Sequence, residues 1–195
     1  MERFGIYGGT FNPIHNGHLH LIRAACAQLS FDRLLVVPAN IPPHKAATDL
    51  ASNRDRLEMA RLATAGMPGV WVSDIELRAR GKSYTILTLE RLRALFPECR
   101  FTLLMGADML ESFDRWHRWQ DILKLADIAA FARNEGEEAL LERKAALIGR
   151  ARVVRVEPLP LSSTLVRERV RRGEDISGLV PEPVAAYIYE KGLYR

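Results

Sequence analysis

The stretch Phe4–Leu21, FGIYGGTFNPIHNGHLHL, decides how the rest of the chain is interpreted. It opens with a short apolar run, Phe4–Tyr7, which ends at the pair Gly8-Gly9. The turn residues Asn12-Pro13 follow, and an amphipathic helical pattern begins by His18. The stretch therefore predicts a strand, a glycine-containing turn and a helix.

This turn has the features of an anion-binding site. Gly8 and Gly9 carry no side chain, so a bulky ligand can approach the main chain closely. The helix that follows points unpaired N–H groups and the positive end of its dipole into the same space. His15 and His18 are three residues apart on one helical face, and Gly17 between them leaves that face uncrowded. We therefore expect two imidazoles to contact one phosphate group.

Two alternatives remain for this stretch. It matches neither G-x-G-x-x-G nor G-x-x-x-x-G-K-[ST], so neither of these phosphate loops is present. In the first alternative the glycines form an ordinary tight turn and the histidines lie in solvent. In the second the histidines bind zinc, for which His20 and Cys26 are the only further local ligands.

A second candidate phosphate element lies at Ser162–Arg167, SSTLVR. Three hydroxyl residues open a helix there, and no Glu or Gln follows at the capping-box position. We therefore expect its N–H groups and hydroxyls to be available to an anion, with Arg167 presenting a guanidinium to phosphate oxygens. The alternative is ordinary N-capping by Ser162, Ser163 or Thr164.

Strand-like runs alternate with helical patterns along the whole chain. The strand runs are Phe4–Tyr7, Arg33–Pro38, Val70–Ser73, Arg100–Met105, Asp127–Ala132 and Arg152–Val156. One of the helices, over Asn53–Ala65, places Leu57, Ala60 and Leu62 near one face. A short helix within Pro181–Arg195, stopped by Gly192, closes the chain. Strands separated by helices predict right-handed parallel units, and so an α/β fold with a doubly wound parallel sheet. A length of 195 residues suits a single domain, residues 1–195.

Polar residues follow the second and fourth predicted strands. Ligands of open parallel sheets bind beyond the carboxyl ends of the strands, so Asn40, His44 and Lys45 are placed to meet the anion, unless they form a plain surface loop. Asp108, after the fourth strand, is a candidate for binding ribose hydroxyls, and its alternative is a helix cap before Met109.

Further along, a hydroxyl cluster begins a helix, and a group of aromatic residues recurs at a fixed spacing. The simplest interpretation of Ser83 and Thr85 is helix capping. Phe113, Trp116 and Trp119 recur at intervals of three, a pattern typical of a core. Trp116, however, lies among charged residues, so we expect it to be incompletely buried and able to present a face to a flat ring, while the other two lie in the core.

Composition narrows the classes of function. The net charge of +4 and pI near 9.3 suit anionic ligands, but basic residues are interleaved with acids, so we expect no nucleic-acid partner. Cys26 and Cys99 do not form a disulfide framework, and no leader or membrane-spanning run is evident. These features predict a cytoplasmic protein without a membrane partner; whether it forms a homo-oligomer stays open.

The run GGTFNPIHNGHL resembles the signature of the nucleotidyltransferase superfamily with the (H/T)-x-G-H motif, most closely that of the bacterial nicotinate-nucleotide adenylyltransferases. Later segments extend the resemblance in the family's order: VPANIPPHK, KSYTILTL, GADMLESFDRWHRW, SSTLVRERV and YIYEKGLYR. The resemblance implies a Rossmann-like fold and transfer of AMP from ATP to nicotinate mononucleotide, giving deamido-NAD and pyrophosphate in NAD biosynthesis. Mg²⁺ would accompany ATP, with no metal held by the protein.

The resemblance also implies the residues of the site. Those implied for ATP are Gly8, Gly9, Thr10, Phe11, His15, His18, Asp108, Ser162, Ser163, Thr164 and Arg167. Those implied for nicotinate mononucleotide are Asn40, His44, Lys45, Tyr84, Thr85, Trp116 and His117. The catalytic groups would be His15, His18, Lys45 and Arg167. Trp116 would stack on the pyridine, and His117 stands where relatives often have tyrosine.

Other functions remain to be weighed. A related adenylyltransferase acting on nicotinamide mononucleotide or phosphopantetheine would share the first motif but lack the KSYT and FDRWHRW context. An aminoacyl-tRNA synthetase would need a much longer chain. A nucleotide-sensing protein would bind ATP without turnover, and the intact histidine pair argues against it.

Overall fold

The computed structural model describes residues 1–40, 49–79, 81–132 and 136–195, so the predicted ligands His44 and Lys45 lie outside the described residues. The strands are β1 (Arg3–Gly9), β2 (Arg33–Pro38), β3 (Val70–Val72), β4 (Arg100–Gly106), β5 (Ala126–Ala132) and β6 (Ala151–Arg155). The α-helices are α1 (Asn16–Leu29), α2 (Asn53–Thr64), α3 (Thr85–Leu95), α4 (Ala107–Glu111), α5 (Trp119–Leu125), α6 (Glu137–Ile148), α7 (Ser163–Arg171) and α8 (Glu182–Lys191), with a 3-10 turn η1 (Phe113–Arg115).

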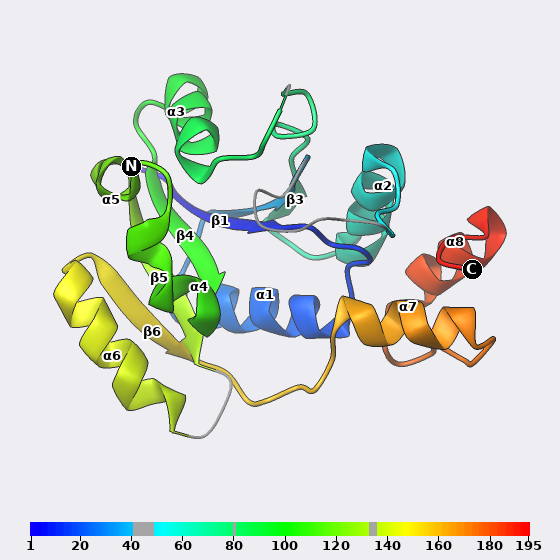
Figure 1. Ribbon diagram of the computed structural model, residues 1–195. Coiled ribbons are helices and arrows are strands. Elements are labelled where there is room, and N and C mark those ends of the chain that lie inside the picture. The colour runs from blue at the N-terminus through cyan, green and yellow to red at the C-terminus, as the bar shows by residue number, and fades with distance from the viewer. Residues whose placement is uncertain (41–48, 80, 133–135) are drawn as a thin grey trace.

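The strands form one parallel sheet in the order β3-β2-β1-β4-β5-β6 (Figure 1). The chain first moves outward from β1 to β3, then crosses to β4 on the other side of β1. The order therefore reverses between β1 and β4, where ligands of such sheets bind beyond the strand ends. The predicted doubly wound parallel sheet is confirmed, and it places the glycine turn at this switch point.

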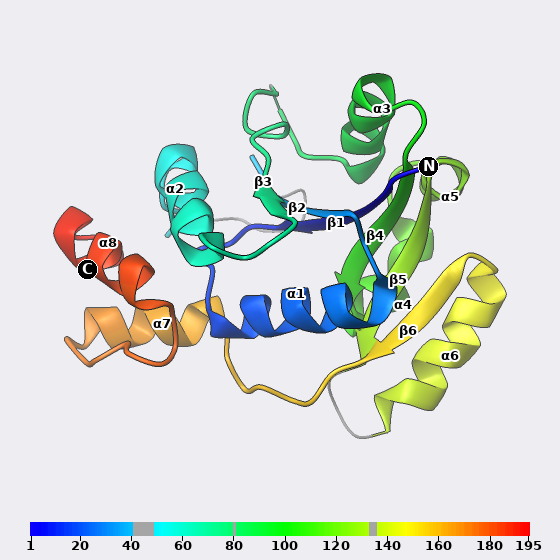
Figure 2. The same cartoon turned by 180° about the vertical axis from the view of Figure 1, so that it is seen from behind.

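Helices cover both faces of the sheet (Figures 1 and 2). Successive residues of a strand point to opposite faces, so Tyr7 of β1 packs in a core with α1, α2, α7 and α8, while its neighbour Ile6 packs in a second core with α3, α4, α5 and α6. Because every strand except the edge strand β3 supplies apolar side chains to both cores, the sheet is buried on both faces, as parallel sheets require.

Most predicted element boundaries agree with the structure. β2 coincides with the predicted run, and α8 is followed by Gly192, whose φ of 61° makes it the predicted left-handed helix stop. The predicted face of α2 is only partly the core-facing one: Ala60 is fully buried on it. Leu57 and Leu62 are only partly buried, whereas Arg56 is fully buried on the core-facing side. An arginine can occupy such a place only with hydrogen-bond acceptors around it, and the local pattern does not reveal them.

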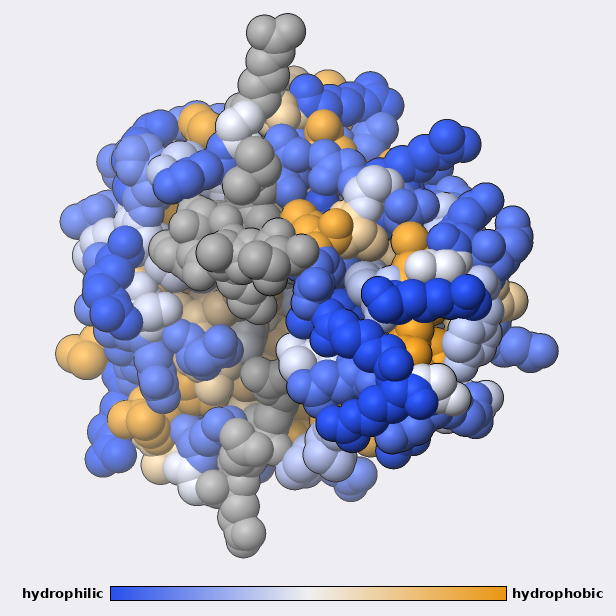
Figure 3. Space-filling model, turned by 45° about the vertical axis from the view of Figure 1, so that its right-hand side comes forward, coloured by the Kyte–Doolittle hydropathy of each residue, from blue (hydrophilic) through white to orange (hydrophobic). Residues whose placement is uncertain are grey.

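The surface agrees with the charged composition. On the face shown in Figure 3, outside its grey part, hydrophilic residues predominate and hydrophobic ones are scattered among them. Isolated exposed apolar side chains are normal on a protein surface. Among the described residues, no helix is both long enough and apolar enough to span a bilayer.

Candidate active site

The two glycines at the end of β1 serve different purposes. A Cβ on Gly9 would lie 2.8 Å from the ring of Phe11, which is 2% exposed and has a left-handed φ of 47°. A Cβ on Gly8 would have nothing within 4 Å. The packing of the turn therefore requires glycine at position 9, whereas position 8 borders open space that a ligand can approach, as expected of a phosphate turn.

The histidine pair is held together at the start of α1. The backbone N–H of His15 donates to Nδ1 of His18 at 3.1 Å, and the two ring centroids are 3.7 Å apart. Nδ1 of His18 must accept this hydrogen bond, so the proton of the neutral ring lies on Nε2. A Cβ on Gly17 would lie 3.0 Å from the His15 ring, which explains the glycine between them. The spacing correctly places both imidazoles on one face of the first turn.

The hydroxyls at the start of α7 are already in use. Ser162 is the N-cap, and its Oγ accepts from the backbone N–H of Leu165 at 3.1 Å. The Oγ of Ser163 donates to the carbonyl of Pro13 at 2.9 Å, which joins α7 to the phosphate turn. The expectation that these hydroxyls stay available to an anion was therefore wrong for Ser163, which donates its proton to Pro13, while Ser162 caps the helix through an acceptor position of its hydroxyl. The first N–H groups of the helix keep no intrahelical acceptor, because helix geometry supplies none.

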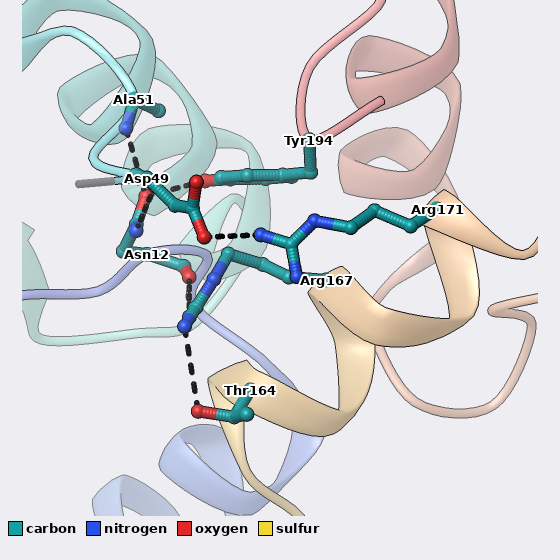
Figure 4. A network of polar contacts seen from close by, with 7 residues as sticks. All are labelled: Asn12, Asp49, Ala51, Thr164, Arg167, Arg171 and Tyr194. Carbon is teal, nitrogen blue, oxygen red and sulfur yellow. Dashed lines mark hydrogen bonds and ion pairs between the residues drawn. The ribbon is translucent and has the colours of Figure 1, made fainter.

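Arg167, one turn further along α7, is fixed by contacts on both sides (Figure 4). Its Nη1 donates to the main-chain carbonyl of Asn12 at 2.9 Å, and its Nη2 donates to Oγ1 of Thr164 at 3.4 Å. Its Nε is buried and has no hydrogen-bond acceptor in the described part of the chain. A buried donor without a partner is costly, and a phosphate oxygen is a ligand that would satisfy a guanidinium.

These elements line one cavity of about 470 Å³. Its lining residues are Tyr7, Thr10, Asn12, His15, Gly17, His18, His20, Leu21, Asp49, Leu50, Glu157, Leu159, Leu161, Ser162, Ser163, Thr164 and Arg167. The histidine pair thus faces the same space as the start of α7, although about 150 residues separate them in the chain. His20 is held at this cavity by a 3.1 Å contact between its Nε2 and the carbonyl of Glu157. The described residues contain no group of three or more His, Cys, Asp or Glu side chains placed to hold a metal ion.

Other predicted ligands lie outside the residues that line this cavity. The rings of Tyr84 and His117 pack against each other beside the start of α3, with centroids 4.8 Å apart, although the two residues come from different elements. Trp116 is partly buried and packs on Phe113, which is fully buried, as predicted. Asp108 is exposed in the first turn of α4, whose N-cap is Gly106, so its alternative role as a cap was wrong.

Ser83 and Thr85 do not cap α3. Thr85 is the first helical residue, and Tyr84 is an N-cap without a side-chain hydrogen bond. Ser83 instead accepts from the backbone N–H of Asn40 at 2.9 Å and hydrogen-bonds the buried carboxyl of Glu76. Burial raises the pKa of Glu76, opposed by its hydrogen bonds to Thr88 and Ser83. The start of α3 therefore keeps its first N–H groups without a side-chain cap.

The comparisons with known proteins agree with this geometry. Residues 6–169 match the cytidylyltransferase-like family. A probable nicotinate-nucleotide adenylyltransferase from Geobacillus thermodenitrificans is 39% identical over 198 residues, covering 100% of this chain and 87% of the relative. Another from Dehalococcoides mccartyi is 38% identical and covers 98% and 96%. The chain belongs to the nicotinate-nucleotide adenylyltransferases of the cytidylyltransferase-like family.

Solved structures of the family share the fold at lower identity. A Plasmodium falciparum nicotinic acid mononucleotide adenylyltransferase complexed with NaAD superposes with a TM-score of 0.82 at 18% identity, covering 100% of this chain and 98% of that one. A putative nicotinate-nucleotide adenylyltransferase from Vibrio parahaemolyticus gives 0.72 at 21% identity, covering 100% and 96%. These matches support the Rossmann-like nucleotidyltransferase fold for this member of the family.

Sequence reasoning missed the residue that joins the loops of this site. The guanidinium of Arg56 donates to the carbonyls of Thr10 at 2.8 Å, Ala51 at 3.2 Å and Asn40 at 3.3 Å. It also donates to Oδ1 of Asn53 at 2.6 Å, and burial lowers the pKa of Arg56. No local signal marks such a residue, because its acceptors come from three separate segments.

Asn40 is used in the same junction. Its Nδ2 donates to the carbonyls of Ala79 at 2.8 Å and Gly81 at 3.3 Å, and its Oδ1 accepts from Asn53 at 2.6 Å. These contacts hold the ends of three loops together. The predicted contact of Asn40 with nicotinate mononucleotide stays a prediction.

Proposed function

We propose that this protein transfers AMP from ATP to nicotinate mononucleotide, producing deamido-NAD and pyrophosphate for NAD biosynthesis. Its membership of the nicotinate-nucleotide adenylyltransferases over the whole chain supports this activity. The structural observation that carries the proposal is the meeting of two cationic or N–H-rich elements, the start of α1 and the start of α7, around one cavity. A nucleoside triphosphate is an anion long enough to contact both.

In the reaction, a phosphate oxygen of nicotinate mononucleotide attacks the α-phosphorus of ATP in line with the leaving group. The new P–O bond forms as the bond from the α-phosphorus to the α–β bridging oxygen breaks, and pyrophosphate departs. The second pKa of a phosphate monoester is about 6, so the attacking group is already ionised near neutrality. The protein therefore needs no general base, and its contribution is to position two polyanions and stabilise moving charge.

We assign that stabilisation to the first turn of α1. The proton of His18 lies on Nε2, because Nδ1 accepts from the N–H of His15. Nε2 is then a hydrogen-bond donor toward the α-phosphate, and His15 stacked beside it is the second imidazole of the pair. A donor fixed before the reaction costs no reorganisation when charge builds up on the phosphate.

We assign the leaving pyrophosphate to α7 and the loop after β2. Arg167 would bind its oxygens through the guanidinium, with the first N–H groups of the helix at Ser163 and Thr164. Lys45, outside the described residues, is proposed to join them. Mg²⁺ would enter with ATP, held by phosphate oxygens and water, and neutralise charge on the leaving group. Asp49, a carboxylate that lines the cavity, is paired with Arg171.

We assign the pyridine end of the mononucleotide to the region of Tyr84 and His117. Their rings lie 4.8 Å apart beside the start of α3, where no side chain caps the first N–H groups. A helix N-terminus favours a carboxylate, and the nicotinate substituent is a carboxylate. Trp116, partly buried on Phe113, would stack on the ring.

The test is pyrophosphate release from ATP, measured in turn with nicotinate mononucleotide, nicotinamide mononucleotide and phosphopantetheine. We expect rapid release with nicotinate mononucleotide and formation of deamido-NAD, identified by mass spectrometry. Release with phosphopantetheine alone would assign the chain to another adenylyltransferase. ATP binding without release with any acceptor would make it a nucleotide-binding protein.

A further inference from the structure

The sequence-based assignment of the site ends at α7, but the structure continues it into the last residues of the chain. The hydroxyl of Tyr194 donates to Oδ1 of Asn12 at 2.8 Å, across 182 positions of sequence (Figure 4). Asn12 lies in the turn between the glycines and the histidine pair, and it lines the cavity. A residue of the closing segment YIYEKGLYR therefore contacts the phosphate turn directly.

Asn12 is the centre of a polar junction. It is 7% exposed, and its Nδ2 donates to the carbonyl of Asp49 at 2.8 Å. Its Oδ1 accepts from both the backbone N–H of Ala51, at 3.0 Å, and the hydroxyl of Tyr194. Every hydrogen-bonding direction of this amide oxygen is thereby committed, so the Asn12 side chain has one defined orientation.

The same residue holds Arg167. The main-chain carbonyl of Asn12 accepts from Nη1 of Arg167 at 2.9 Å. Any rotation of the Asn12 peptide would therefore move the guanidinium that we assign to the leaving phosphates. Burial raises the pKa of Tyr194 well above its usual range, so its hydroxyl stays protonated and can donate at physiological pH.

Neighbouring contacts direct the same segment onto the phosphate turn. The backbone N–H of Asn16, at the start of α1, donates to the carbonyl of Leu179 at 2.8 Å, and its Nδ2 donates to the carbonyl of Gly178 at 2.7 Å. The chain from Gly178 to Tyr194 thus contacts the turn at Asn12, before the histidine motif, and at Asn16, between the two histidines.

We propose that Tyr194 is a positioning residue for ATP: its hydroxyl orients Asn12, and Asn12 in turn sets the guanidinium of Arg167 and the phosphate turn. The inference rests on the proposed function, because it assigns the ATP phosphates to this cavity. Tyr194 does not touch the reacting atoms. It fixes the groups that do.

The test compares two variants that each remove one hydroxyl from the same end of the chain. Tyr194→Phe deletes the bond to Asn12. Tyr187→Phe is the matched control, because the hydroxyl of Tyr187 donates to Oδ1 of Asp55 on α2, at 2.9 Å, and does not line the cavity. Each loses one hydrogen bond, so a purely structural role predicts similar losses in thermal stability and no kinetic difference.

We expect Tyr194→Phe to raise the KM for ATP by about 5- to 10-fold, the factor that corresponds to the net free energy of one hydrogen bond. The KM for nicotinate mononucleotide should change by less than about twofold, as should both constants in Tyr187→Phe. Equal kinetics in the two variants would overturn the proposal. So would an effect of Tyr194→Phe that falls equally on both substrates.

A double variant tests whether Tyr194 acts through Arg167. If it does, the change in KM for ATP in Tyr194→Phe/Arg167→Ala should be clearly smaller than the product of the two single effects, since the second change removes the group that the first displaces. Full multiplicativity would contradict the pathway through Asn12.

The dissociation constant of ATP, measured by calorimetry without acceptor, separates this inference from the proposed function. A wild-type protein that binds ATP but transfers no AMP would refute the activity, while the ratio of ATP affinities between Tyr194→Phe and wild type would still decide the role of Tyr194. A wild-type protein that fails to bind ATP would overturn both.

Discussion

At the scale of single residues, the site depends on how one ring is oriented. The N–H of His15 donates to Nδ1 of His18, and the absence of a Cβ on Gly17 leaves room for the His15 ring beside it. The contact fixes the tautomer of His18, so the donor is in place before substrate arrives. The spacing H-x-G-H thus encodes the orientation of the His18 ring as well as the presence of two imidazoles.

The first prediction separates two functions of the His18 ring: Nδ1 accepts from the N–H of His15, and Nε2 is proposed to donate to the α-phosphate. His18→Ala removes both nitrogens and should lower kcat on the order of 10²- to 10³-fold, the usual cost of losing one such donor. His18→Asn offers an acceptor close to the position of Nδ1 but has nothing in place of Nε2, and it should be equally slow. Steady-state pyrophosphate release measures both, with circular dichroism confirming the fold.

Near-normal turnover in His18→Asn would show that the ring serves only to cap α1. Near-normal turnover in both variants would remove His18 from the mechanism.

At the scale of elements, α7 contributes both a cap and a ligand, and these can be tested apart. Arg167→Ala should raise the KM for ATP by about 10-fold or more, because a charge-assisted phosphate contact is stronger than a neutral hydrogen bond. The matched control is Arg169→Ala on the same helix, whose guanidinium pairs with Glu174 at 3.7 Å and is substantially exposed. That change should leave the KM for ATP within about twofold, since exposed ion pairs contribute little.

Substrate titrations with both variants decide the assignment. An effect of Arg167→Ala confined to the mononucleotide would place Arg167 on the wrong ligand, and an equal effect of Arg169→Ala would indicate a general electrostatic contribution of α7.

The junction between α2 and the loops of the site gives a prediction for stability. Arg56→Met would leave the carbonyls of Thr10, Ala51 and Asn40 without this donor inside the protein, at a cost of about 3 kcal/mol or more in the free energy of unfolding. The control is Arg54→Ala, an exposed position on the same helix, for which we expect a change within about 0.5 kcal/mol. Urea denaturation measures both.

If Arg56→Met unfolds at the same urea concentration as wild type, water replaces the guanidinium at no cost, and Arg56 does not hold these loops together.

At the scale of the whole molecule, local patterns predicted the layers but not the contacts that join them. The apolar run Arg33–Pro38 and the glycine stop at Gly192 depend on neighbours in sequence, and both predictions are confirmed. Arg56 and Tyr194 depend on acceptors 46 and 182 positions away, which no local pattern contains. The prediction that the hydroxyl of Ser163 stays available to an anion was wrong for the same reason, because its acceptor, the carbonyl of Pro13, is 150 positions away in the chain.

The whole fold also bears on the choice of substrate, because it brings the start of α3 and the η1–α5 connection together at Tyr84 and His117. Nicotinate and nicotinamide mononucleotides differ only in a carboxylate, which accepts hydrogen bonds, and a carboxamide, whose NH₂ donates them. If the N–H groups near Thr85 and His117 converge on this substituent, the amide turns a donor toward donors. Such mismatches in a desolvated site discriminate by roughly 10⁴ in kcat/KM.

Trp116→Ala should weaken the binding of both substrates with little change in the ratio of their kcat/KM values, because stacking does not depend on the substituent. Measuring kcat/KM for both mononucleotides in wild type and Trp116→Ala tests this, and comparable values in the wild type would refute the N–H pocket even where adenylyl transfer is observed.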